Sequence, residues 1–316
     1  MLRRLILTRV LTSLGTLLLV SMFIFGAVEL LPGDVARQIV GREASEQQLQ
    51  IIRQQLGLDR PVVDRYLSWL GGALRLDFGN GIISKRPVIG IIAPRLRNTL
   101  ILALAAFILY VPISLVFSLL SAGFRGRHID ALLSGVTLVT LSIPEFVMGT
   151  ILLIIFASSL RWLPALSLIE DARNVGEALR ALLMPALTLA IAMSAYAIRM
   201  LRDNLIEVLD SEYVLMATLK GLPRRNVLLQ HALPNALGPA LNVTALNLVY
   251  LIGGVVIVER IFSYPGLGSL LVDSISLRDA PLISAAALLV SATYILANLA
   301  ADVGVLLLNP RLRTST

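Results

Sequence analysis

Cysteine is absent from the sequence, histidine occurs twice, and only two of the 27 basic residues are lysine. A chain without cysteine has no disulfide framework and no thiolate metal site. His128 and His231 form no His-Glu-x-x-His pattern, which argues against a zinc site built from histidines. Charged residues make up 15% of the chain, against about 25% in an ordinary soluble domain. These shortages argue against a soluble enzyme, a disordered chain and a fibrous repeat.

A phosphate-binding loop is missing as well. Such a loop needs Gly-x-x-x-x-Gly-Lys-Ser/Thr, so that backbone amides and one lysine hold the phosphates. Lys85 follows Ser84 and Lys220 follows Leu219, so neither lysine completes the motif. Pro265-Gly266-Leu267-Gly268 lacks a third glycine and follows no strand, which predicts a turn after a helix. We therefore expect no catalytic residues, no cofactor site and no metal site in this chain.

Apolar residues make up 57% of the chain. A bilayer core about 30 Å thick requires about 20 mostly apolar residues as helix. Six stretches are long enough: Val10–Val28, Thr99–Ala122, Ala131–Ser158, Leu182–Leu201, Ala240–Val258 and Leu282–Leu308. After the first comes Glu29-Leu30-Leu31-Pro32, a poor cleavage site, so we expect a retained helix and not a secretory signal. The sequence predicts an all-α polytopic membrane protein with six transmembrane helices.

The basic residues that flank these stretches indicate the orientation, because short cytoplasmic flanks carry an excess of lysine and arginine. Twelve lie on one side: Arg3, Arg4, Arg9, Arg125, Arg127, Arg199, Arg202, Lys220, Arg224, Arg225, Arg311 and Arg313. Five lie in the short loops opposite: Arg161, Arg173, Arg180, Arg260 and Arg278. Both termini should be cytoplasmic. The polar segment Glu29–Asn98 should be extracytoplasmic, with helices on the outer face of the membrane.

The longest predicted cytoplasmic connection, residues 202–239, is patterned. Asp210-Ser211-Glu212 favours a helix start, with acids near the helix N-terminus. The residues that follow at helical spacing are Tyr213, Met216, Ala217 and Lys220. Gly221 suits a chain reversal at the helix end, because glycine accepts positive φ. The pattern predicts a helix, a glycine turn, a short second helix and entry into the next span. On composition alone, a solvated connector is the alternative.

This segment resembles the cytoplasmic coupling motif of binding-protein-dependent ABC importers, in which an alanine-containing helix and a glycine precede hydrophobic-x-Leu-Pro. Here Gly221 precedes His231-Ala232-Leu233-Pro234, with histidine at the hydrophobic position, and Glu212…Ala217 matches the Glu-Ala-Ala element in a looser form. The resemblance implies a set of ATPase-coupling residues: Glu212, Tyr213, Ala217, Lys220, Gly221, Leu233 and Pro234.

Motifs along nearly the whole chain are similar to the peptide/nickel-type (dipeptide/oligopeptide) permeases of such importers. They are Met1-Leu2-Arg3-Arg4, Leu30-Leu31-Pro32-Gly33-Asp34, Gly57-Leu58-Asp59-Arg60-Pro61, Leu76-Asp77-Phe78-Gly79, Arg86-Pro87-Val88, Trp162-Leu163-Pro164, Glu259 to Gly268, Arg278-Asp279-Ala280-Pro281 and Asn309 to Arg313. The family more often has aspartate at the place of Asn309 and an aromatic residue at the place of Ala280.

The resemblance implies a type I ABC importer permease architecture in a bacterial cytoplasmic (inner) membrane. Its implied partners are a homologous second permease subunit, two ABC ATPase subunits and an extracytoplasmic substrate-binding protein, with the lipid bilayer around it and no nucleic acid. ATP and Mg would bind in the partner ATPases. Peptides or similarly sized solutes would be transported.

The expected division of the chain follows from these assignments. Residues 1–98 comprise the first transmembrane helix and the extracytoplasmic segment. Residues 99–308 form the importer transmembrane domain with five helices and the coupling segment 202–239. Residues 309–316 form a cytoplasmic tail.

Polar residues within the predicted spans are candidates for the pathway, since ionisable groups at bilayer depth are costly. Glu145 follows Ser142-Ile143-Pro144 and could contact a cation or a substrate amine. It could instead be satisfied by helix ends opened at Pro144 or by an arginine of the partner permease. Asn247, Tyr250 and Gly254 share one helix face, which should meet protein or water. Asn247 and Tyr250 could line the pathway, or they could pack against neighbouring helices. Arg202 is expected to extend to the inner interface.

Two other functions compete with the importer subunit. An ion-coupled secondary carrier acting without ATPase subunits would need an ion relay and commonly shows inverted repeats. Only Glu145 and Asp302 are acids within the predicted spans, and no repeat is evident. A membrane scaffold without transport would not need the patterned segment 202–239.

Overall fold

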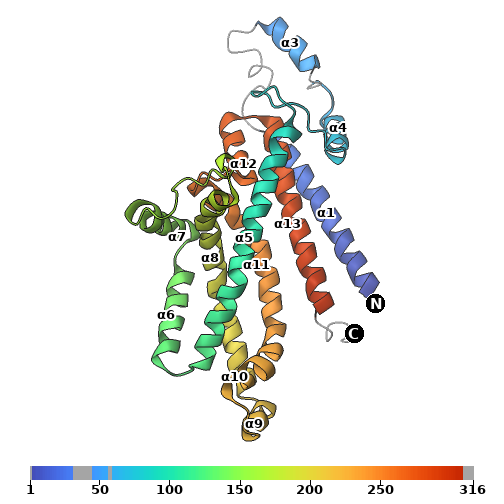
Figure 1. Ribbon diagram of the computed structural model, residues 1–316. Coiled ribbons are helices and arrows are strands. Elements are labelled where there is room, and N and C mark those ends of the chain that lie inside the picture. Colours follow the sequence, from blue (N-terminus) through green and yellow to red (C-terminus); the bar gives the residue numbers. More distant parts are fainter. Residues whose placement is uncertain (1, 31–44, 56–58, 309–316) are drawn as a thin grey trace. The chain divides into compact units, whose positions relative to one another are not determined.

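The computed structural model describes residues 2–30, 45–55 and 59–308 (Figure 1). Within these ranges every regular element is a helix, apart from an isolated bridge between Asn80 and Pro87. The predicted all-α membrane fold is confirmed. The motifs at residues 31–34, 57–58 and 309–313 lie outside the described residues.

Four helices of the described residues are long and apolar enough to cross a membrane. They are Ile6–Glu29 within α1 (Leu2–Glu29), α5 (Val88–Gly123), α8 (Val175–Leu209) and Ala280–Gly304 within α13 (Ala280–Leu308). A fifth span results if α6 and α7 are counted as one. α11 (Leu233–Ile261) contains the remaining predicted stretch, Ala240–Val258, but the structure does not describe the side chains of six of its residues. The count of six stays a prediction.

The stretch expected as one span at Ala131–Ser158 is not a continuous helix. α6 (His128–Ser142) ends before Ile143-Pro144. After this break the chain forms α7 (Glu145–Leu152) and then a π-helix from Leu153 to Ser159, and this second part is bent by 111° relative to α6. Figure 1 shows this turn between α6 and α7. The physical reason is Pro144, because proline disfavours helical φ/ψ at the residue before it, and Ile143 is extended here.

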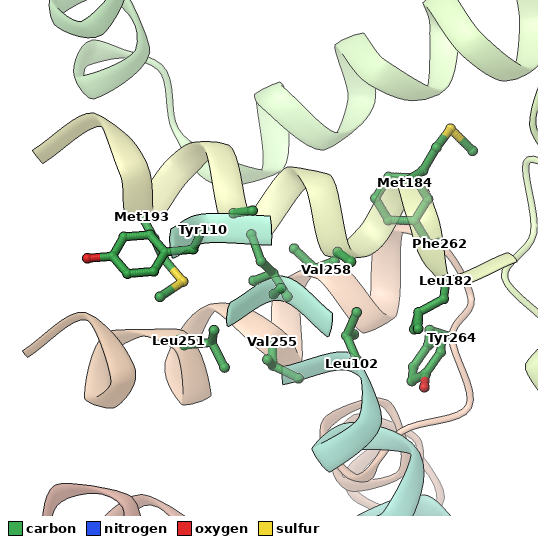
Figure 2. Close-up of a cluster of buried hydrophobic side chains, with 14 of the residues drawn as sticks. Leu102, Tyr110, Leu182, Met184, Met193, Leu251, Val255, Val258, Phe262 and Tyr264 are labelled. Atoms are coloured by element: carbon green, nitrogen blue, oxygen red, sulfur yellow. The ribbon is translucent and has the colours of Figure 1, made fainter. Parts of the chain in front are cut away.

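By internal contacts the chain forms two units, and the larger comprises residues 1–7, 100–264 and 296–316. Its core lies where α5, α8 and α11 pack together, around Leu102, Tyr110, Met193, Val255 and Phe262 (Figure 2). α8 is central to it. Buried residues make up 72% of its apolar window, against 11–28% for the other three candidate spans. Small residues of α8, such as Ala186 and Ala190, allow the close helix approach that membrane interiors favour.

The second unit comprises residues 8–99 and 265–295. It contains α3 (Glu46–Gln55), α4 (Val62–Leu74) and α12 (Leu267–Leu277). The turn predicted at Pro265 to Gly268 lies earlier, at Phe262 and Ser263, and Leu267 and Gly268 already belong to α12. Before α12, the Asn98 amide donates to the Pro265 carbonyl at 2.9 Å, and the Leu267 amide donates to the Thr99 hydroxyl at 2.8 Å. The extracytoplasmic position expected for α3 and α4 stays a prediction.

Candidate coupling segment and pathway residues

The chain between α8 and α11 has the local structure that its sequence predicts. α9 (Glu212–Leu219) begins directly after Ser211, and Gly221 has a φ of +80°. α10 (Arg224–Asn226) and a π-helix from Val227 to Ala232 then lead into α11. The helix start and the glycine turn are confirmed. The connection is shorter than 202–239, because α8 continues to Leu209 and α11 begins at Leu233.

One side of α9 packs within the chain. Val214 and Ala217 of α9 are buried against Val227, beside Val208 and Leu209 of α8. Ala217 is only 5% exposed. Its side chain therefore holds α9 in place and is not available to a partner subunit.

The other side of α9 is exposed and largely apolar. Tyr213, Leu215, Met216 and Leu219 are all exposed, and so are Glu212, Lys220 and Gly221. The Tyr213 hydroxyl donates to the His231 carbonyl at 3.2 Å. Of the last two predicted coupling residues, Leu233 packs against the cluster around Leu205 and Ala236, whereas Pro234 is exposed. These exposed apolar side chains make this side of α9 a candidate surface for protein contact.

Two arginines that sequence reasoning missed attach this segment to the end of α5. Arg125 donates to both carboxylate oxygens of Asp210, at 2.8 and 2.7 Å. Arg224 donates to the Gly123 carbonyl at 2.7 Å. α9 and α10 are therefore linked on both sides to the short loop between α5 and α6. No local pattern could reveal these contacts, because the partners are 85 and 101 residues apart.

A partly buried ion pair lies beside these links. Arg202 of α8 donates from Nε and Nη2 to the two oxygens of Asp130, both at 2.8 Å, and Ser121 donates to Asp130 at 2.6 Å. The pair joins the ends of α5, α6 and α8. The structure adds this pairing with Asp130 to the expected position of Arg202 at the inner interface, which stays a prediction.

Glu145, the first residue of α7, lies against α11. A β-carbon built on Gly254 would be 2.6 Å from each carboxylate oxygen of Glu145. The carboxylate therefore occupies the space that a side chain at position 254 would need. Among the described residues, no hydrogen bond or ion pair to this carboxylate is formed. Gly149, one helical turn farther along α7, packs against Phe262 and Thr188.

Asn247 and Tyr250 differ in their surroundings. Asn247 is 9% exposed, and its amide donates to the Tyr110 hydroxyl and to the Met193 carbonyl, both at 3.2 Å. These contacts support helix packing for Asn247. Tyr250 is 69% exposed on α11. Lining of the pathway stays a prediction for Glu145, Asn247 and Tyr250. No group of three or more His, Asp or Glu side chains within the described part of the chain is placed to hold a metal ion.

Comparison with known proteins identifies relatives over the full length of the chain. The family described as "Binding-protein-dependent transport system inner membrane component" matches residues 114–314, and the N-terminal region of such components matches residues 1–103. A probable peptide ABC transporter permease of Sinorhizobium fredii is 36% identical over 308 residues, covering 98% of each chain. The glutathione transport system permease of Escherichia coli K12 shows the same identity and coverage.

Proposed function

The chain belongs to the family of inner membrane components of binding-protein-dependent transport systems, and it is a permease subunit of an ABC importer. We propose that its solute is a peptide or a molecule of similar size. Support for this solute class comes from the relatives, one described as a peptide permease and one as a glutathione permease.

We propose that this subunit forms the pathway together with a homologous second permease. Two separate ATPase subunits would bind on the cytoplasmic side with ATP and Mg, and an extracytoplasmic binding protein would deliver the solute. The sequence supports a separate energy source, since neither lysine of the chain completes a phosphate-binding loop. The excess of basic residues in one set of flanks supports cytoplasmic termini.

The observation that carries the proposal is the exposed apolar side of α9. Leu215, Met216 and Leu219 protrude from a short helix whose other side is packed against α8 and held by Arg125 and Arg224. We propose that this side docks on an ATPase subunit and that Glu212, Tyr213, Lys220, Gly221 and Pro234 form or border the contact. Ala217 and Leu233 would shape it from within. A rigid docked helix can pass the closure of the ATPases to α8 and α11, which it connects.

Replacing Met216 by aspartate tests the docking. In the free subunit the new carboxylate would lie on an exposed surface, so the fold should persist. In the docked contact the same carboxylate would lose its hydration, which weakens docking. Co-purification of the ATPase subunits should fall at least about tenfold, the loss that corresponds to about 1.4 kcal/mol of binding free energy. Leu74→Asp in α4 of the second unit, where Leu74 is also exposed (80%, against 61% for Met216), is the matched control and should leave co-purification unchanged. Equal recovery of the ATPases with both variants would contradict the docking role of α9.

A further inference from the structure

In the larger unit, the carboxylate of Glu145 in α7 lies against α11 at Gly254, one helical turn from Tyr250. Tyr250 and Gly254 are four residues apart on α11, so they lie on adjacent turns of one face. The bond from Cα to Cβ in a helix tilts toward the N-terminus, and the Glu145 carboxylate occupies the position of the missing β-carbon of Gly254. The carboxylate therefore lies on the side of Gly254 that faces the turn of Tyr250.

The sequence predicts that this surface lies within the bilayer. Gly254 is inside the predicted span Ala240–Val258 and seven residues before the last residue of α11, which is about 10 Å at the helical rise of about 1.5 Å per residue. Glu145 is inside the predicted span Ala131–Ser158 and belongs to a bent pair of helices that together have the length and apolarity of a span. We therefore expect both Glu145 and Tyr250 within the apolar layer.

Lipid is a poor environment for such a surface. Acidic side chains within membrane segments face protein interiors or water-filled cavities, because lipid cannot solvate them. The backbone break at Ile143-Pro144 adds a second constraint, since open backbone at this depth is tolerated only inside protein or beside water.

The carboxylate lacks a cation within the described part of the chain. Glu145 takes part in no ion pair there, and its approach to α11 is possible only because residue 254 has no side chain. A carboxylate held by packing, with no cation of its own among the described residues, can bind a positively charged group. An ammonium or guanidinium group would pair with it in a charge-assisted hydrogen bond.

We propose that Glu145, held against α11 at Gly254, binds the positively charged group of the solute as it passes through the permease. This inference rests on the proposed function for the existence of a solute pathway, and it adds a preference for solutes that carry an ammonium or guanidinium group. Gly254 acts as a positioning residue, because any side chain there would displace the carboxylate.

The absence of cysteine from the chain allows a direct test that does not depend on the identity of the solute. Tyr250→Cys is prepared in the complete importer, with the partner permease and ATPases present. The rates of thiol modification by a trimethylammonium methanethiosulfonate and by its sulfonate counterpart are then compared. With Glu145 present, the cationic reagent should gain about tenfold over the anionic one, because a fixed charge concentrates counter-ions in a cleft. Glu145→Gln should remove this gain, and Glu145→Asp should retain most of it.

Two results would overturn the proposal. If neither reagent modifies Cys at position 250 in the assembled importer, the surface is covered, as it would be by the partner permease. If both reagents react and Glu145→Gln leaves their ratio unchanged, the carboxylate attracts no cation. A failure of the peptide proposal would be recognised separately, as an importer that takes up no peptide but still shows the charge preference at position 250.

Discussion

Replacing Gly221 by valine tests whether the angle between α9 and α10 matters for coupling. Gly221 has a φ of +80°, and a β-carbon built there would have no neighbour within 4 Å. The substitution therefore creates no steric clash with other residues, and its whole effect comes from backbone conformation. A β-branched residue in the left-handed region costs on the order of 1–2 kcal/mol, which corresponds to a shift of about 5- to 30-fold in a local equilibrium.

We expect Gly221→Val to leave membrane insertion intact, to weaken co-purification of the ATPase subunits by about that factor, and to abolish solute uptake. Gly221→Asn is the matched control, because asparagine visits the left-handed region much more readily than valine. It should retain most of both activities. Equal behaviour of the valine and asparagine variants, whether both normal or both defective, would refute the conformational reasoning. Normal docking and transport by Gly221→Val would remove this turn from the mechanism.

Further predictions concern the ion pairs and the orientation. Arg202→Ala should destabilise the purified subunit by about 1–3 kcal/mol, because Asp130 then keeps only its hydrogen bonds from Ser121 and Gly126, and the double variant with Asp130→Ala should recover much of this loss in a thermal unfolding assay. Arg125→Ala alone should cost no more than about 1 kcal/mol, since both it and Asp210 are largely exposed. Arg224→Ala should weaken ATPase co-purification more than Arg125→Ala does, because it frees the Gly123 carbonyl at the end of α5. In intact cells, an impermeant thiol reagent should label a single cysteine at position 70 but not one at position 220, which should react only after the membrane is permeabilised; labelling of position 220 in intact cells would contradict the orientation.

The parts of the molecule that sequence predicts well are those set by local physics. The start of α9 at Glu212 and the positive φ of Gly221 follow from helix-start and glycine preferences of a few neighbouring residues. The helical class follows from apolar runs of sufficient length, although α5 and α8 extend beyond their predicted limits. In α5 the added residues include Arg95, Arg97 and Asn98, and in α8 they include Glu177, Arg180 and Asp203, so a hydropathy criterion ends the span there although the helix continues.

The features that sequence reasoning missed depend on distant residues or on backbone geometry. Hydropathy does not register the bend at Pro144, because an apolar count stays high on both sides of it. The signal was the Ser142-Ile143-Pro144 sequence itself. The pairing of Arg202 with Asp130 spans 72 residues, and the contact of Glu145 with Gly254 joins two helices far apart in the chain. Such contacts arise from the packing of α7, α8 and α11, which no single-sequence pattern specifies.

Solute uptake by the purified importer in proteoliposomes tests the central claim most directly. This chain, its partner permease, the ATPase subunits and the binding protein are reconstituted with a labelled peptide outside and ATP inside. We expect accumulation that requires ATP and every one of these subunits, with no uptake and no ATP hydrolysis by this chain alone. Accumulation by this chain alone, driven by a proton or sodium gradient without ATPase subunits, would contradict the assignment and identify a secondary carrier.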